Sequence, residues 1–486
     1  MAQNNNQPSL YWYDYETFGA DPRRDRPAQF AGIRTDLDLN IIGEPLCIYC
    51  RPANDFLPHP EACLITGISP QKALVEGLPE VEFIHQINEE FSQPNTCVVG
   101  YNNIRFDDEI TRFSLYRNFY DAYAREWQNG NSRWDIIDMV RLTYALRPEG
   151  IEWATHPDGK PSFRLEQLTA ANGISHEAAH DALSDVHATI AMAKLIREKQ
   201  PRLYDYVFER RTKQKIAQLL NVAKPIPVLH VSSMYPAELG CIALVAPLVA
   251  HPINKNEVIV YDLRVDPQEF LNLSVKEMSE RLFVRQDELP EGCDRLPIKT
   301  IHINKSPIVV PANTMSEESA KRWKIDADVA QQYLDTLLAS PQFITNTQAI
   351  FKNRDFEPVS DPDLMLYSGG FFSNSDRSRM EIVHDTEPDQ LGSLELPFDD
   401  SRLPEMLFRY RARNYPETLD ANEKFSWDEY RHQHLLASNG EPGFTYEKFK
   451  QSVIDVRQRD DLDTEEIKII DEIEQYAKDI MSSLSK

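Results

Sequence analysis

The sequence predicts an α/β domain at the N-terminus, a small β-barrel or sandwich in the middle and a mostly helical C-terminal region. At residues 10–19, aromatic and apolar residues run up to Gly19 in the pattern of a buried strand, and strands with interspersed helices follow. After Pro225, short strand-like runs alternate with loops that contain Pro, Asn and Asp. From residue 364 onward the pattern is mostly helical.

The first domain should continue from its first strand into a hairpin and then alternate strands with helices. The further strands expected there are residues 28–34, 40–50 and 96–101. The helices expected there are residues 81–93, 108–118, 134–146 and 181–200. Pro148 and Pro201 follow the last two helices and end them.

The middle and C-terminal regions are separated by changes in composition. The strands expected in the middle region are residues 228–231, 241–249, 257–263 and 298–310, with a helical pattern at 315–351. A loop rich in Asp and Pro at 354–363 marks the next boundary. We therefore expect three domains, at residues 1–200, 201–354 and 355–486.

Charge and cysteine content limit the cellular location and the binding partners that the sequence allows. The chain of 486 residues has a formal net charge of −25, which at first sight argues against a nucleic-acid partner. The negative charge is concentrated towards the C-terminus, however, and residues 202–224 are locally basic, so basic patches remain possible. The six cysteines are sparse, the N-terminus is polar, and no apolar run has the length of a membrane span. We expect a cytoplasmic protein.

Two acidic residues on the first strand carry the strongest chemical signal. Asp14 and Glu16 are two positions apart, so their side chains lie on one face of the strand, roughly 7 Å apart along it. Like charges at about 4 Å repel by roughly 4 kcal/mol at an effective dielectric constant near 20. Protonation or a bound cation relieves that repulsion, and carboxylate oxygens suit Mg²⁺ or Mn²⁺. An isolated Asp-x-Glu is more often a pair of solvated acids, so the interpretation depends on other residues.

Two further acids and a histidine complete the pattern. Asp107 lies where the loop after the 96–101 strand enters a helix, and Asp185 lies five residues after His180. A five-residue step turns roughly 140° around a helix, so Asp185 and His180 suit different tasks. Asp185 can ligate a metal, and the imidazole can deprotonate an attacking water. Four carboxylates can hold two divalent ions, which stabilise the attacking and leaving oxygens in phosphoryl transfer.

A competing pattern overlaps this one. His176 to His180 spells H-E-x-x-H, the pattern of zinc proteases, and on a helix the two histidines would share a face. The sequence offers no convincing third zinc ligand, and a protease would leave the other acidic positions without a role. We therefore favour the phosphoryl-transfer interpretation.

The three motifs, taken in order, resemble those of a known superfamily. They are Asp14-x-Glu16-Thr17, Asn103-x-x-x-Asp107 and His180-x-x-x-x-Asp185, and they resemble the exonuclease motifs of the DEDD superfamily, histidine subtype, which has a ribonuclease H-like fold. The whole chain is also similar to the bacterial exonuclease I family. The stretches typical of that family are residues 100–103, 116–121, 145–150 and 410–414.

The resemblance implies an architecture, an activity and roles for the motif residues. It implies a ribonuclease H-like exonuclease domain, an SH3-like domain and a helical C-terminal domain, which remove 5′-mononucleotides from the 3′ end of single-stranded DNA with Mg²⁺. Asp14, Glu16, Asp107 and Asp185 would be metal ligands, and His180 would be the general base. Glu16 and Thr17 would lie next to the substrate, with Thr17 near the terminal 3′-hydroxyl. Asp108 is an alternative to its neighbour, but the spacing from Asn103 favours Asp107.

Single-strand binding needs a basic track with aromatic stacking platforms. Residues 105–147 interleave the two residue types, and Arg164 between the second and third motifs could clamp a phosphate. The residues favoured for substrate contact are Arg112, Tyr123, Trp127, Arg141 and Arg164. The alternative is that the aromatic residues are core and the arginines form ion pairs. A second interleaved cluster at 409–415 either contacts DNA or packs the helical domain against the others.

The motifs and the resemblance together favour a 3′→5′ exodeoxyribonuclease that acts on single-stranded DNA, and the resemblance implies a monomer that serves DNA repair and recombination. One alternative is a 3′→5′ exoribonuclease, because residue types do not reveal a filter for the 2′-hydroxyl. Another is a non-catalytic single-strand scaffold, against which the full set of four acids and a histidine argues. The resemblance also implies a protein partner, the single-stranded DNA-binding protein, whose acidic tail would need a basic pocket. Candidates for that pocket are Arg147, Tyr206 and the 210–215 run.

Overall fold

The computed structural model describes residues 7–175, 181–285, 288–352, 359–436 and 443–484. They form two compact units. The first unit comprises residues 1–132, 176–187 and 358–486, and the second comprises residues 133–175 and 188–357. The first unit therefore combines the N-terminal strands and helices with the whole helical C-terminal region.

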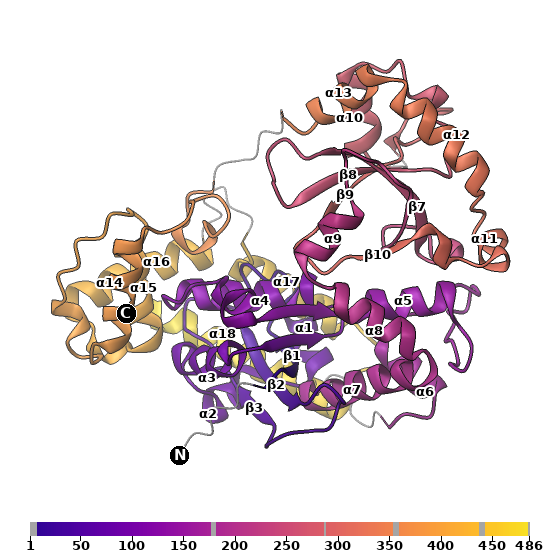
Figure 1. Cartoon of the computed structure of the whole chain (residues 1–486). Helices are drawn as coiled ribbons and strands as arrows, with labels where there is room; N and C mark the ends of the chain where they lie inside the picture. Colours follow the sequence, from indigo (N-terminus) through magenta and orange to yellow (C-terminus); the bar gives the residue numbers. More distant parts are fainter. Residues whose placement is uncertain (1–6, 176–180, 286–287, 353–358, 437–442, 485–486) are drawn as a thin grey trace. The chain divides into compact units, whose positions relative to one another are not determined.

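The first sheet places β1 at its centre. Its strands are β1 (Ser9–Thr17), β2 (Pro27–Thr35), β3 (Leu46–Tyr49), β4 (Thr96–Gly100) and β5 (Ser132–Asp135), in the order β3-β2-β1-β4-β5. The chain passes from the first unit to the second within β5. β1 pairs with β2 in antiparallel and with β4 in parallel orientation, and all but one of its residues are buried (Figure 1, indigo). Burial on both faces explains why the sequence of this strand is a nearly continuous aromatic and apolar run.

Helices from both ends of the chain pack around this sheet. The helices of the first unit are α1 (Pro60–Thr66), α2 (Pro70–Glu76), α3 (Glu80–Ser92), α4 (Asp107–Arg117), α14 (Asn374–Asp385), α15 (Leu403–Asn414), α16 (Ala421–Leu436), α17 (Tyr446–Arg457) and α18 (Thr464–Leu484). One core joins Tyr13 and Tyr15 of β1 to apolar residues of α3, α4 and α15. A second core joins α1 to α17 and α18. The C-terminal helices thus complete the packing of the N-terminal sheet.

The second unit contains an antiparallel sheet with flanking helices. Its strands are β6 (Val228–Val231), β7 (Ile242–Ala250), β8 (Glu257–Asp262), β9 (Ile298–His302) and β10 (Ile308–Pro311), in the order β10-β6-β7-β8-β9. Its helices are α5 (Ile137–Leu146), α6 (Leu165–Ala171), α8 (Pro201–Arg210), α9 (Lys213–Leu219), α10 (Val275–Phe283), α11 (Glu317–Arg322), α12 (Ala327–Leu338) and α13 (Pro341–Ala349). Helix α7 (Ala182–Lys199) begins in the first unit and continues in the second.

The predicted fold class is confirmed, and the differences lie at element boundaries. The strand predicted at 40–50 is confined to β3, because Gly43 with φ of 76° and Pro45 interrupt the extended chain before it. Residue 134 lies in β5 rather than in a helix, and α5 begins only after Asp135, whose carboxylate accepts a hydrogen bond from the Ile137 amide. The single strand predicted at 298–310 is two strands. The three domain boundaries stay a prediction.

No helix among the described residues is long and apolar enough to cross a membrane.

A buried ion network binds the C-terminal helices to the N-terminal part of the first unit. Arg413 of α15 donates hydrogen bonds to Asp55 at 2.9 Å and to Asp363 at 2.6 Å, and its side chain is 3% exposed. Arg409 donates to Asp363 at 3.0 Å. Burial alone would raise the pKa of Asp55, but the guanidinium groups of Arg413 and Arg26 outweigh it and bring the pKa to about 2. For the 409–415 cluster, the arrangement supports packing rather than DNA contact.

Replacing Arg413 by Met should destabilise the first unit, because Asp55 and Asp363 then stay buried without their main cation. Loss of one partner from a buried pair typically lowers the free energy of unfolding by about 3–5 kcal/mol. The measurement is the midpoint of thermal unfolding by circular dichroism. The matched control is Arg457→Met, since the outer pairs of Arg457 with Asp471 and Glu474 should contribute less than about 1 kcal/mol. Equal midpoints for the two variants would contradict this role of Arg413.

Candidate functional site

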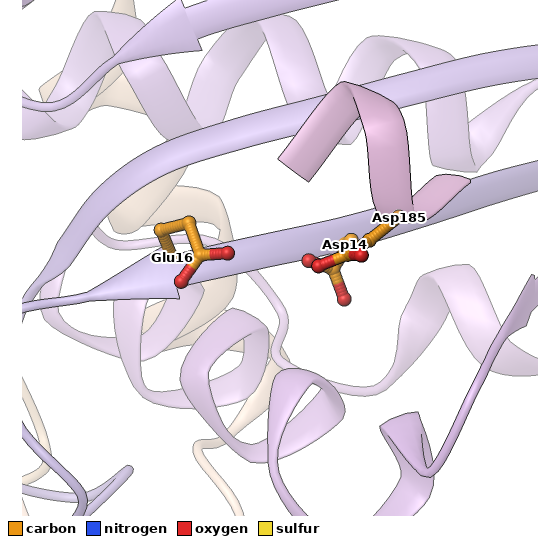
Figure 2. Close-up of side chains that lie close together, drawn as sticks. All are labelled: Asp14, Glu16 and Asp185. Atoms are coloured by element: carbon orange, nitrogen blue, oxygen red, sulfur yellow. The ribbon is translucent and has the colours of Figure 1, made fainter. Parts of the chain in front are cut away.

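Three carboxylates from two elements meet on one face of β1. Asp14 and Glu16 project from the strand, and Asp185 reaches them from the first turns of α7 (Figure 2). One carboxylate oxygen from each of the three residues lies within 4.8 Å of the others. The alternation of side chains along a strand places the first two together, and the start of α7 supplies the third. The structure thus brings together three of the four acids that the sequence predicts as ligands.

The fourth acid, Asp107, lies against the same strand. It is the first residue of α4, it is 6% exposed, and one of its carboxylate oxygens accepts a hydrogen bond from the Tyr15 amide at 3.3 Å. A helix start is a favourable place for a carboxylate, because the helix dipole is positive there. Its negative charge also acts on Asp14. Asp107 therefore belongs to the same electrostatic cluster.

Burial and repulsion from neighbouring acids make the ionised forms of Asp14 and Glu16 unfavourable. Burial raises the pKa of Asp14 well above its usual range, and the charges of Asp107, Glu16 and Asp185 raise it further. Burial, followed by the charges of Asp185 and Asp107, raises the pKa of Glu16 to about 9. A cluster of this kind can be ionised at neutral pH when a cation offsets the repulsion. The donor set consists of carboxylate oxygens, which Mg²⁺ and Mn²⁺ prefer.

Asp181, at the start of α7, belongs to the acidic cluster although its sequence pattern did not single it out. Asp181 accepts a hydrogen bond from the Ser184 amide at 3.2 Å, as an N-terminal capping residue does, and one from the Gln29 side chain at 3.4 Å. Gln29 lies on β2 opposite Glu16. The negative charge of Asp181 also raises the pKa of both Glu16 and Asp14. An Asp at the first position of the predicted 181–200 helix was the available signal. The predicted base His180, and His176 at the other end of the H-E-x-x-H pattern, lie outside the described residues.

Thr17 closes β1 beside the acids. It is 7% exposed, and its hydroxyl donates a hydrogen bond to the Gly19 carbonyl at 2.7 Å. The pairing of β1 with β2 shifts register between Glu16 and Thr17, so the strand bends at this point. The structure therefore places Thr17 at the end of the acidic face.

Arg112 is engaged inside the first unit. It is 4% exposed, and its guanidinium group donates two hydrogen bonds to Glu126, at 2.7 and 3.0 Å, and one to Glu109 at 2.8 Å. It also lies over the ring of Tyr123, 5.3 Å from the centroid. This arrangement favours the ion-pair alternative for Arg112 over direct contact with DNA, and it gives Arg112 the role of supporting Tyr123.

Two of the predicted stacking residues have accessible rings. Trp127 is 66% exposed. Tyr123 is half-buried, packs edge-on against Phe371, and lines an open pocket of about 700 Å³. Phe371 is itself 80% exposed. Aromatic faces of this kind can stack on bases of any sequence.

The remaining predicted contacts lie in the second unit. Arg141 is mostly buried, donates to Asp138 at 2.5 Å and lies over the Phe163 ring, whereas Arg164 is exposed at the start of α6. Of the residues expected to meet a protein partner, Arg147 donates to the Thr314 carbonyl at 3.1 Å, and the Tyr206 ring lies 3.9 Å from the Arg210 guanidinium carbon. Of the two arginines predicted to contact phosphate in this unit, Arg164 is therefore more accessible than Arg141.

Comparison with known proteins places the whole chain in one family. Residues 11–193 match a family model described as exonuclease, residues 211–353 one described as exonuclease I SH3-like domain, and residues 360–480 one described as exonuclease I C-terminal domain. These matches confirm the predicted order of exonuclease, SH3-like and helical C-terminal domains.

Curated relatives and solved structures agree with the family models. The chain is 46% identical to exodeoxyribonuclease I of Escherichia coli over 482 residues, which cover 99% of this chain and 100% of that protein. It is 50% identical to exodeoxyribonuclease I of Haemophilus influenzae over 432 residues, or 88% of this chain and 91% of that protein.

Among solved structures, exonuclease I of Methylocaldum szegediense matches with a TM-score of 0.94 and 50% identity, over 98% of this chain and 100% of that one. E. coli exonuclease I in complex with a dA16 oligonucleotide matches with a TM-score of 0.93 and 46% identity, over the same shares of the two chains. The zinc-bound form of an E. coli exonuclease I complex with single-stranded DNA matches with a TM-score of 0.92 and 46% identity, again over 98% and 100%. The chain therefore belongs to the exonuclease I family, and it is an exonuclease, an enzyme of the hydrolase class.

Proposed function

We propose that this protein degrades single-stranded DNA from its 3′ end and releases 5′-mononucleotides. The observation that carries the proposal is the cluster of Asp14, Glu16 and Asp185 on the face of β1, with Asp107 beside it. Such a cluster needs a compensating cation, and a cation held there is suited to the charge on a phosphodiester. Solved relatives that bind DNA oligonucleotides, by their descriptions, match 98% of this chain and support DNA as the substrate.

We propose that the four acids hold two divalent cations, Mg²⁺ or Mn²⁺. Cations bound there would neutralise the phosphate and lower the pKa of bound water. The carboxylate oxygens fit both ions, and burial together with the neighbouring acids, which raise the pKa of Glu16 to about 9, makes a compensating cation favourable there. Glu16 would face the last phosphodiester, and Thr17, at the end of the same strand, would lie near the terminal 3′-hydroxyl.

We propose His180 as the general base. It directly precedes Asp181, which is fixed at the start of α7 by bonds from Ser184 and Gln29. A neutral imidazole accepts a proton from water at neutral pH, and this transfer typically contributes 10²–10⁴-fold to the rate. The role of Asp185 is distinct, because its carboxylate is within 4.8 Å of those of Asp14 and Glu16.

The single strand would be held by stacking on Tyr123 and Trp127 and by phosphate contacts to Arg164 and Arg141. Arg112 would act by holding Tyr123 in place. Accessible aromatic rings and an accessible guanidinium group support these assignments. Sequence-tolerant stacking suits an enzyme that must degrade any strand.

The finer biological setting is part of the same proposal. The similarity to proteins named exodeoxyribonuclease I supports DNA rather than RNA as the substrate of this chain. The acidic cluster argues against a non-catalytic scaffold. We propose a cytoplasmic monomer in DNA repair and recombination. Its partner would be the single-stranded DNA-binding protein, bound by its acidic tail near Arg147, Tyr206 and residues 210–215. We retain domain boundaries at 1–200, 201–354 and 355–486.

The protein should shorten a 5′-labelled single strand stepwise from the 3′ end, and only with a divalent cation. Blunt duplex DNA should resist, because a single strand must enter the site. The measurement is gel analysis of end-labelled DNA, duplex and RNA of one sequence, with Mg²⁺ and with EDTA. Equal cleavage of duplex, or activity that persists in EDTA, would exclude this function. Faster cleavage of RNA would favour the exoribonuclease alternative.

Binding of single-stranded DNA should weaken as salt rises, with a slope of about −0.7 in log–log form for each phosphate contact. Arg164→Ala should reduce the magnitude of the slope by about that amount, because its exposed side chain can reach a phosphate. Arg141→Ala should do the same if its pair with Asp138 opens. The measurement is fluorescence anisotropy over a salt series in EDTA. The matched control, Arg457→Ala on α17, should keep the wild-type slope, and an unchanged slope for Arg164→Ala would remove it from the substrate track.

His180→Ala should leave metal and DNA binding intact while turnover falls roughly 10²–10⁴-fold, as for loss of a general base. Asp14→Ala and Asp185→Ala should instead weaken metal binding, since each removes a ligand carboxylate. The measurements are calorimetric titration with Mn²⁺ and single-turnover kinetics. His176→Ala is the matched control and should change little. Identical behaviour of His176→Ala and His180→Ala, with stoichiometric zinc in the purified protein, would instead support the H-E-x-x-H zinc site.

A further inference from the structure

Two consecutive acids at the start of α4 have different surroundings. Asp107 accepts a hydrogen bond from the Tyr15 amide beside the acidic cluster. Asp108 is fully buried and accepts hydrogen bonds from the Tyr13 hydroxyl at 2.9 Å and from Arg125 at 2.7 Å. Successive residues on a helix are about 100° apart, so one acid can face the cluster while the other faces the core. Asp108 is therefore placed behind the site rather than in it.

The core face of β1 is fastened to the same helix. Tyr13 and Tyr15 alternate with Asp14 and Glu16 along the strand, so the tyrosines lie on the opposite face from the acids. The Tyr13 hydroxyl also accepts a hydrogen bond from the Asn103 side chain at 3.2 Å, and the Tyr15 hydroxyl accepts one from Thr111 at 3.1 Å. The strand that carries two acids and the helix that carries a third are thus joined directly behind the site.

The charge on Asp108 is balanced by a residue that comes later in the chain. The side chains of Asp108 and Arg125 are both 0% exposed, and the guanidinium group of Arg125 lies 4.9 Å from the centre of the Phe91 ring. A buried ion pair contributes little net stability, since well-packed apolar residues of similar volume often serve as well. It does impose direction, because a charge-assisted hydrogen bond is short and geometrically strict. Because Asp108 directly follows Asp107, a hydrogen bond that orients Asp108 also orients the start of α4 and with it Asp107.

We propose that Arg125, Asp108 and Tyr13 are positioning residues that set the distance of Asp107 from Asp14 and Glu16, and through it the affinity of the site for divalent cations. The inference rests on the proposed function of the acidic cluster. Mg²⁺ demands nearly ideal octahedral geometry with oxygen distances of about 2.0–2.1 Å, so a small shift of the α4 start relative to β1 weakens binding. Residues that orient metal ligands typically contribute 10–100-fold to metal affinity.

Tyr13→Phe tests the proposal most directly, because it removes the hydroxyl and keeps the buried ring. The dissociation constant for Mn²⁺, measured by calorimetry without DNA, should rise roughly 10- to 100-fold. The Mg²⁺ concentration for half-maximal turnover should rise in parallel, and excess Mg²⁺ should restore much of kcat. DNA affinity in EDTA, and KM for DNA at saturating Mg²⁺, should stay as in the wild type. Tyr476→Phe is the matched control, since it too removes a tyrosine hydroxyl that donates one hydrogen bond within the first unit, to the Ala53 carbonyl at 3.1 Å.

A purely structural role predicts a different result. It would lower the midpoint of thermal unfolding of Tyr13→Phe and leave the Mn²⁺ dissociation constant equal to that of the wild type and of Tyr476→Phe, which would overturn the proposal. Arg125→Lys keeps the charge but loses the planar guanidinium group, so it should raise the Mn²⁺ dissociation constant by a smaller factor than Tyr13→Phe. If Tyr13→Phe does not fold, the Mn²⁺ dissociation constant of Arg125→Lys tests the proposal instead. A wild-type protein that binds Mn²⁺ but does not cut DNA would refute the proposed function alone, because the Mn²⁺ comparison between variants stands without turnover.

Discussion

Repulsion among buried and partly buried carboxylates is the constraint on which the first unit is built. Asp14 and Glu16 are held in place by the pairing of their part of β1 with β2, and the preceding residues 9–12 also pair with β4. Asp185 and Asp107 come from the starts of helices, where the dipole favours an anion but does not cancel three neighbours. Contacts away from the acids keep β1 and α4 in place despite this repulsion. They are the hydrogen bonds of the tyrosines on the opposite face of β1, the ion pair of Arg125 with Asp108, and the C-terminal helices packed around the sheet. A rigid scaffold of this kind keeps ligands at cation-binding distances before a cation arrives.

The positions of the acids were predictable because they follow from local periodicity. Alternation along a strand places residues 14 and 16 together, and a loop that enters a helix places residue 107 at its start. The contribution of Asp181 was less visible, since its bond to Gln29 joins residues 152 positions apart. The same holds for Arg125, whose acid lies 17 residues earlier on another element. Spacing reveals which residues share an element, but it does not reveal which elements meet.

The partners of the arginines in the arginine-rich stretches were also not predictable from the sequence, because they lie far away along the chain. The 105–147 and 409–415 stretches have equal claims to a DNA track when only residue types are considered. In the structure, Arg112 meets Glu126 and the Tyr367 hydroxyl, 14 and 255 residues away, and Arg413 meets Asp55, 358 residues away. An arginine with a buried acid as partner is not available to a phosphate, and that partner is set by tertiary structure. Exposed rings such as Trp127 therefore carry more information about the substrate surface than the count of basic residues does.

The net charge of −25 and the acidic site both oppose the approach of a polyanion, so on the proposed function cations and local contacts must offset them. Without cations, the face of β1 repels a phosphate, so on the proposed function the strand must be held through stacking and through the few accessible arginines. Two divalent cations would neutralise the four carboxylates, and on the proposed function the 3′-terminal phosphodiester would then contact the cations at the reacting position. Cation binding and binding of the strand terminus are then thermodynamically linked: each must strengthen the other by the same factor. Binding along the rest of the strand need not depend on the cations at all. On the proposed function, stacking and phosphate contacts would bind the length of the strand. The cations held by the carboxylates would act only at its 3′ end, where the reaction takes place.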